Sequence, residues 1–212
     1  MKAIIKHLAI FAILVIIFPT SCKNDDSNPN PEPEFGTFTD PRDNQVYTTV
    51  EICTQTWFAQ NLNYATDSDS WVYNDDPSND EIYGRLYTWE MAKTVCPDGW
   101  HLPDVDEWST LVYDYLGGFE IAGGKLKATD TVYWKSPNFG ATNESGFTAL
   151  PGGHYSFGES FYSLGKIATF WSSVEKDSFT AYKYDLTYKS TQIYTDPDYK
   201  SAGKSVRCVK DE

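Results

Sequence analysis

CPDGWHLPDVDEW, residues 96–108, combines a turn, an extended segment and a helix start in one short stretch. Pro97 and Gly99 favour a tight turn, because proline fixes φ and glycine is free to adopt a positive φ. Pro103 keeps the residue before it out of the α region, so the segment between the turn and Pro103 is predicted to be extended. A helix is expected to begin directly afterwards.

Asp104 is the predicted N-cap of this helix. Its carboxylate can accept a hydrogen bond from the backbone N–H of Glu107, whose side chain can reach back to the N–H of Asp104, as in a capping box. Gly117 and Gly118 are expected to end the helix. Between the two ends, apolar residues recur with helical spacing and form one apolar face: Trp108, Leu111, Val112, Tyr115 and Leu116.

The stretch resembles the signature of the Fibrobacter succinogenes major paralogous domain, a bacterial cell-surface module grouped with the C-type-lectin-like folds. The resemblance implies an α+β, C-type-lectin-like fold with two short helices, a small, mostly antiparallel twisted sheet and a long loop region. Five further stretches match the family in order: QTWFAQNLNY at 55–64, YGRLYTW at 83–89, GFTALPGG at 146–153, FWSS at 170–173 and SVRCV at 205–209.

Local patterns fit this expectation. Residues 46–52 alternate between apolar and polar, and Trp57 and Phe58 follow after a short break, which predicts a β-hairpin. Thr88 can cap a second short helix that runs through Val95. Three later stretches are expected to close the sheet: 168–173, 179–187 and 205–209.

The N-terminal segment has the features of an export signal. Lys2 and Lys6 precede an apolar run at 8–18, which is shorter than the about 20 residues of a membrane-spanning helix. Residues 1–21 are therefore predicted to be a lipoprotein signal peptide. The small residue before Cys22 suits a lipoprotein signal peptidase, so Cys22 is the predicted lipidation site, with ordinary secretion as the alternative.

The residues that follow are predicted to link this anchor to the domain. The short acidic run after Cys22 resembles the signal that sends lipoproteins to the outside of the outer membrane, so a lipid-anchored cell-surface location is expected. Residues 22–38 hold little that could be buried and are predicted to be a disordered tether. A single domain is expected over 39–212.

The chain is acidic, with 30 acidic and 17 basic residues and a formal net charge of −13. Nucleic-acid binding needs a basic surface, so no nucleic-acid partner is expected, and contact with the membrane is expected through the lipid alone. Aromatic residues make up 16% of the chain, which suits either a dense core or a binding face rich in tyrosine and tryptophan.

Three cysteines remain once Cys22 is assigned to the lipid. Cys96 and Cys208 lie in two of the matched motifs, so the resemblance implies a disulfide that ties the start of the central helix to the last strand. A bond between Cys53 and Cys96 is the alternative. In the first case Cys53 is the odd thiol and, if exposed, could form an intermolecular bond.

Residues 118–165 are rich in glycine and aromatic residues, which indicates short elements and long loops. The long loop region of lectin-like folds is where ligands usually lie, so the resemblance places the binding site here. Aromatic rings suit the faces of sugars without any metal. Trp134, Tyr155 and Tyr162 are therefore the candidate contact residues.

No cofactor is expected, although the acidic segment 67–81 offers oxygen ligands for Ca²⁺. Its spacing does not match an EF-hand loop, and a solvated surface loop is the alternative. The ligand triplets of calcium-dependent lectins are absent, and Trp171, Ser172 and Ser173 stand where the resemblance would place a Trp-Asn-Asp triplet. No metal site is therefore predicted.

Catalytic motifs are absent too: the chain has no G-x-S-x-G, P-loop, H-E-x-x-H or CxxC sequence. His101 is expected to be a structural imidazole that is hydrogen-bonded to the backbone. These observations predict a non-catalytic, lipid-anchored surface module that binds a glycan or a surface protein. The alternatives are a structural assembly or fimbria-tip subunit and an enzyme that acts on polysaccharide.

Overall fold

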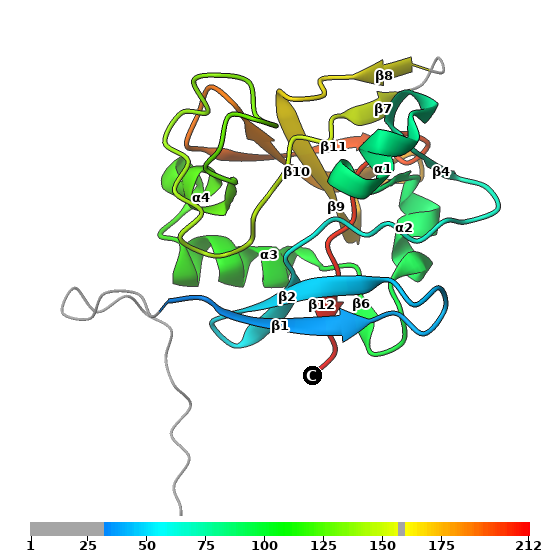
Figure 1. Cartoon of the computed structure of the whole chain (residues 1–212), viewed down its shortest axis with the longest axis horizontal. Helices are drawn as coiled ribbons and strands as arrows, with labels where there is room; N and C mark the ends of the chain where they lie inside the picture. The colour runs from blue at the N-terminus through cyan, green and yellow to red at the C-terminus, as the bar shows by residue number, and fades with distance from the viewer. Residues whose placement is uncertain (1–31, 157–159) are drawn as a thin grey trace, which may run out of the picture.

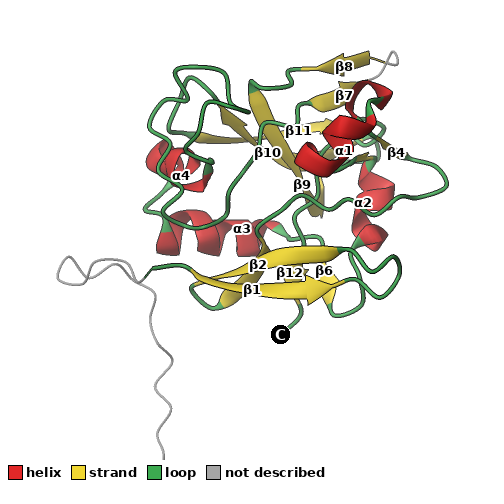
Figure 2. Ribbon diagram, viewed as in Figure 1, coloured by secondary structure: helices red, strands yellow, loops and turns green. Residues whose placement is uncertain are grey.

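The computed structural model describes residues 32–156 and 160–212, which form a mixed α+β fold (Figures 1 and 2). The predicted signal peptide, residues 1–21, and the predicted lipidation site Cys22 lie outside the described residues. Every strand pair within the named sheets is antiparallel. The predicted single small sheet is nevertheless wrong, because the described strands divide into four separate sheets.

The largest sheet has five strands in the order β1-β2-β3-β12-β6 and lies at the bottom of Figure 1, where the C-terminus emerges. The predicted hairpin is confirmed, because Val50 on β2 pairs with Trp57 on β3. β12 pairs with both β3 and β6, so the last strand of the chain lies between these two strands of the sheet. The bounds are β1 Glu34–Thr39, β2 Val46–Ile52, β3 Gln55–Phe58, β6 Trp100–His101 and β12 Val209–Lys210.

Strand β1 corrects the predicted tether and domain start. Residues 34–38 were expected to be disordered, but the whole of β1 pairs with β2 from Glu34 to Thr39. Phe38 packs against Phe58 at a ring distance of 5.8 Å and against Trp100 at 5.3 Å. The polar composition of this segment gave no sign of a strand. Backbone pairing with β2 and the packing of the Phe38 ring are enough to order it as an edge strand.

The second sheet has the order β11-β10-β9 and lies above the first one in Figure 1. Its two long strands form at the predicted stretches 168–173 and 179–187, but they belong to a separate sheet and do not close the first one. Strand β11 was not predicted, because it is an exposed edge strand that contains Pro197, and its apolar alternation is therefore weak. The bounds are β9 Ile167–Glu175, β10 Thr180–Thr187 and β11 Ile193–Tyr199.

Two short hairpin-like pairs complete the strands. β4 (Ser70–Trp71) pairs with β5 (Leu86–Tyr87), and β7 (His154–Ser156) pairs with β8 (Ser160–Tyr162). β7 lies within the glycine-rich region in which the binding site was expected.

The central helix forms as predicted. Helix α3 (Val105–Ser109) begins with the capping box, in which Glu107 N–H donates to Asp104 at 2.9 Å and Asp104 N–H donates to Glu107 at 2.8 Å. It continues as the π-helical turn η2 (Thr110–Tyr115) and ends before Gly117, which has a φ of 83°. Helix α2 (Trp89–Val95) is also confirmed, with Thr88 as its cap.

The prediction of two helices is incomplete. Helix α1 (Pro77–Tyr83) arises in the acidic segment after the 3₁₀ turn η1 (Tyr73–Asp75). Helix α4 (Phe119–Leu126) contains Gly123 and Gly124, which disfavour a helix in isolation. Helix α4 packs closely against the segment that contains Gln192, and this contact explains Gly123. A Cβ at Gly123 would lie 2.3 Å from the carbonyl oxygen of Gln192.

Most of the large aromatic side chains lie in two apolar clusters. Trp108 of α3 is fully buried in the first and stacks on Tyr184 at 4.5 Å. Trp171 of β9 is fully buried in the second, where its indole N–H donates to the carbonyl oxygen of Tyr87 at 2.8 Å. The aromatic content therefore serves chiefly the core.

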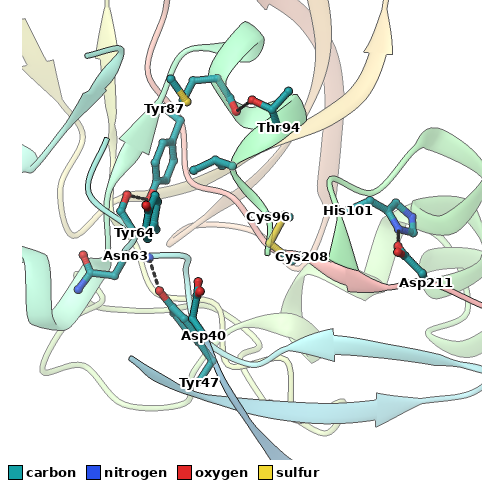
Figure 3. Close-up of a disulfide and its surroundings, with 12 residues drawn as sticks. Asp40, Tyr47, Asn63, Tyr64, Tyr87, Thr94, Cys96, His101, Cys208 and Asp211 are labelled. Carbon is teal, nitrogen blue, oxygen red and sulfur yellow. Dashed lines mark hydrogen bonds and ion pairs between the residues drawn. A yellow bond between two sulfur atoms is a disulfide. The ribbon is translucent and has the colours of Figure 1, made fainter. Parts of the chain in front are cut away.

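The predicted disulfide between Cys96 and Cys208 is present, with the two Cα atoms 5.9 Å apart (Figure 3). It joins the end of α2 to the residue before β12, across 112 positions of sequence. The alternative pairing of Cys53 with Cys96 is therefore wrong. Cys53 is not an odd thiol either, because none of the cysteines in the described part of the chain is free. No helix in that part is long and apolar enough to cross a membrane.

Candidate functional site

The three predicted contact residues do not form one site. Trp134 is only 1% exposed, and its indole N–H donates to the carbonyl oxygen of Ala149 at 2.9 Å. It belongs to the first apolar cluster, so its assignment as a ligand contact is wrong. The surrounding polar loop gave the impression of exposure, whereas the ring itself fills the core beneath that loop.

Tyr155 and Tyr162 lie on opposite faces of the β7–β8 hairpin, because successive side chains of a strand alternate. Tyr162 is 49% exposed and stacks on its cross-strand partner His154 at 5.8 Å. Tyr155 instead stacks on Trp71 at 4.1 Å, away from His154. Tyr162 is therefore the predicted residue that remains on an accessible aromatic surface.

His154 also lines a polar pocket on one face of the sheet β11-β10-β9. We call this pocket of about 310 Å³ the charged pocket. Strand register explains its composition, since Asp185 lies opposite Thr169 and Lys183 lies opposite Asp196, which places their side chains on one face. The lining comprises His154, Ile167, Thr169, Lys183, Asp185, Asp196, Pro197, Asp198 and Lys204.

Two lysines hold the pocket together through ion pairs. The Lys183 ammonium lies 2.6 Å from Asp185 and 2.5 Å from Asp196. The Lys204 ammonium lies 2.7 Å from Asp198 and 4.9 Å from the ring centre of Trp171. Lys204 is 1% exposed and forms the floor, whereas the Asp196 side chain is 63% exposed and marks the rim.

Burial and neighbouring charges set the protonation of these groups. Burial lowers the pKa of Lys204, although Asp198 opposes this effect. Burial also acts against the charge of Lys183, but Asp185 and Asp196 outweigh it, and the pKa of Lys183 is raised. Burial, joined by the Lys204 charge, lowers the pKa of His154, so its imidazole is neutral at pH 7.

The charged pocket also holds hydrogen-bonding capacity that the protein does not use. The hydroxyl oxygen of Thr169 and the Oδ1 atom of Asp185 are both buried, and neither has a hydrogen-bond partner in the described structure. Buried polar atoms are usually paired, because an unpaired one costs about 1–3 kcal/mol. An unmet donor and an unmet acceptor beside each other indicate that something else can bind there.

Sequence reasoning missed every residue of this pocket. Alternating polar residues on β10, from Lys183 to Asp185, were the available signal. The facing positions Thr169 and Asp196 lie in other strands, and only the register brings them together.

The acidic segment 67–81 forms part of a separate groove on the Tyr155 side of the hairpin. Trp71, Asp75, Asp80 and Arg85 line this groove, in which burial raises the pKa of Asp80. No group of three or more His, Cys, Asp or Glu side chains within 32–156 and 160–212 is arranged to hold a metal ion. Calcium binding by the segment is thus a hypothesis without a ligand set in the described structure.

His101 has a structural environment different from the predicted one. Its ring contacts two carboxylates and not the backbone. One is Asp211 at 2.6 Å (Figure 3), and the other is Glu107 at 2.7 Å. Burial acts against protonation, but the hydrogen bonds to Asp211 and Glu107 outweigh it, and the pKa of His101 is raised. The imidazole thereby fastens the C-terminal segment to the helix cap.

Comparison with known proteins places these features in a family. The described fold is an α+β domain with a disulfide-tied C-terminal strand. The chain belongs to the Fibrobacter succinogenes major domain family, whose model matches residues 50–210. No curated protein and no solved structure matches the chain.

Proposed function

We propose that this protein is a non-catalytic recognition module with a C-type-lectin-like fold, which binds a glycan in the charged pocket. In this proposal the N-terminal export signal directs the protein to the cell surface, at the outside of the outer membrane. The family membership and the order of the matched motifs support the fold assignment. The signal-like N-terminus supports the location.

The observation that carries the proposed binding is the pair of unmet atoms, Thr169 Oγ1 and Asp185 Oδ1, in a pocket open to solvent. Hydroxyl groups of a sugar can both donate and accept, so they can satisfy both atoms. The half-exposed ring of Tyr162 beside His154 offers an apolar surface for a sugar face. This combination favours a glycan over a protein surface.

The assembly-subunit alternative loses one of its motivations. It relied in part on an odd thiol at Cys53 for intermolecular bonding, and Cys53 is not free. Recovery of a surface protein in place of a glycan remains the result that would favour it.

A glycan array probed with the purified full-length chain tests the proposal, with Ca²⁺ in one arm and a chelator in the other. We expect selective binding of the same intensity in both arms. Thr169→Val should abolish this selectivity, whereas the same exchange at Thr180, which lies on β10 outside the pocket lining, should preserve it. Absence of glycan binding, or binding that survives Thr169→Val unchanged, would contradict the proposal.

A further inference from the structure

We propose that the charged pocket selects a neutral, hydroxyl-rich sugar residue over a uronic acid or an amino sugar. This inference rests on the proposed function and adds the chemical class of the ligand. The charged groups of the pocket are already paired with one another, and its free hydrogen-bonding atoms suit a neutral ligand.

An anionic ligand has no free cation to bind. The pocket holds two ammonium groups, and each one is already paired with carboxylates: Lys183 with Asp185 and Asp196, and Lys204 with Asp198. His154 adds no positive charge at pH 7, because burial lowers its pKa. With three carboxylates around two ammonium groups, a uronic acid would meet an excess of negative charge.

A cationic ligand is disfavoured at the unmet acceptor, although the pocket holds one more carboxylate than ammonium groups. The unmet acceptor is the Oδ1 atom of Asp185, and the other oxygen of that carboxylate is already bound to Lys183 at 2.6 Å. An ammonium group on Oδ1 would therefore lie close to a second ammonium in a half-buried site, where like charges repel strongly. A neutral hydroxyl donor satisfies Oδ1 without this repulsion.

The geometry suits two adjacent hydroxyl groups. Asp185 and Thr169 are direct cross-strand partners on β10 and β9, so their side chains are neighbours on one face of the sheet. One sugar hydroxyl can donate to Asp185 Oδ1, while the next accepts from the hydroxyl of Thr169. The volume of about 310 Å³ is at the lower end for ligand pockets and suits one sugar ring.

Tyr162 offers an apolar contact next to His154. Its ring is 49% exposed and stacks on the His154 ring that lines the pocket. An apolar sugar face can lie against this ring while the hydroxyl groups enter the pocket. Charged substituents contribute nothing to such a contact.

The test compares sets of sugars that differ at one carbon. The uronic acid has a carboxylate in place of the C6 hydroxymethyl group, and the 2-amino derivative has an ammonium in place of the 2-hydroxyl group. Glucose, galactose and mannose, each with its uronic acid and its 2-amino derivative, are displayed on a neutral polymer, and binding of the full-length chain is measured by biolayer interferometry. For the sugar that binds, we expect the neutral form to bind at least about tenfold more tightly than either charged form. The affinity should be nearly independent of salt, since no net charge is neutralised on binding.

Two variants connect the selectivity to the pocket. Thr169→Val should reduce the affinity for the neutral sugar about tenfold or more, and it should leave melting unchanged or raised, because it removes a buried hydroxyl that has no partner. Asp75→Asn, in the separate Trp71 groove, is the matched control and should leave the affinity unchanged.

The outcomes separate the two proposals. Tighter binding of a uronic acid or an amino sugar, with loss on Thr169→Val, would overturn the neutral-sugar inference and leave the glycan-binding proposal in place. Absence of binding to every sugar and to the glycan array would overturn both. Neutral-sugar binding that resists Thr169→Val would place the ligand outside the charged pocket and overturn both proposals.

Discussion

The Lys204 ammonium lies 2.7 Å from the Asp198 carboxylate, and 1% of the Lys204 side chain is exposed. This ion pair connects strand β11 to the segment that leads into the matched SVRCV motif. It also forms the floor of the charged pocket, whose lining includes Thr169 and Asp185 with their unmet atoms. The stability of the domain and the shape of the pocket therefore depend on the same contact.

Asp198→Asn should destabilise the protein strongly. The exchange leaves a buried ammonium without its counter-charge, and breaking a buried pair in this way costs about 3–5 kcal/mol. Asp196→Asn is the control, because Asp196 is 63% exposed and Lys183 keeps Asp185 as a partner. In urea denaturation we expect the free energy of unfolding of the control variant to fall by less than about 1 kcal/mol. Equal losses for the two variants would contradict this description of the pocket floor.

Removal of the disulfide should be costly. Replacing Cys96 and Cys208 together by serine frees a long loop in the unfolded chain, so the free energy of unfolding should fall by about 2–5 kcal/mol. Non-reducing peptide mapping should recover the peptides that contain Cys96 and Cys208 as one linked species. Recovery of Cys96 linked to Cys53 would show that the assigned pairing is wrong.

The His101 contacts predict a pH dependence. The pKa of His101 is raised in the folded state, so the folded protein binds a proton that the unfolded chain releases near its ordinary pKa of about 6.5. The stabilisation is fully present below that pH and is lost as the pH rises through the folded-state pKa. The difference in unfolding free energy between the wild type and His101→Gln should therefore shrink from mildly acidic to alkaline pH.

NMR titration of the histidine rings checks the cause. Asp211→Asn should lower the pKa of His101, because it removes one of the two carboxylates that stabilise the imidazolium. His154 is the internal reference, and its pKa should stay below the ordinary value in both proteins. An unchanged pKa of His101 in Asp211→Asn would contradict the assigned contact.

Arg207 gives a further stability prediction. Its guanidinium is 1% exposed and donates to the carbonyl oxygens of Phe58, Phe147 and Thr148 and to the side chain of Asn61. Burial lowers its pKa to about 9. Arg207→Met should leave buried carbonyl groups unpaired and lower the free energy of unfolding by about 3 kcal/mol or more. Arg85 forms an ion pair with Asp80 at 3.6 Å, so Arg85→Met should lower the free energy of unfolding by less in the same denaturation assay.

Local signals in the sequence were the most reliable. The capping box at Asp104 and Glu107 and the hairpin that ends at Phe58 depend on neighbours in the chain, and both are confirmed. Strand β1 was not predicted, because its order comes from pairing with β2. Helix α4 was not predicted either, because Gly123 makes a tertiary contact that local helix propensity does not include.

The candidate site was less predictable for a related reason. Burial decides whether an aromatic residue in a polar loop is a contact, and Trp134 and Tyr162 look alike in sequence although one is buried and the other exposed. The charged pocket needs the register of three strands, which brings Thr169, Lys183 and Asp196 onto one face. Alternation within one strand gives no information on that register.

The most direct test of the central claim is an NMR titration of the ¹⁵N-labelled full-length chain with the neutral sugar that binds on the array. The largest shift changes are expected on Thr169 and Asp185, which carry the unmet atoms, on His154, which lines the charged pocket, and on Tyr162, which stacks on His154. Shift changes centred instead on Trp71 and Arg85 in the separate groove would show that the sugar does not bind in the charged pocket.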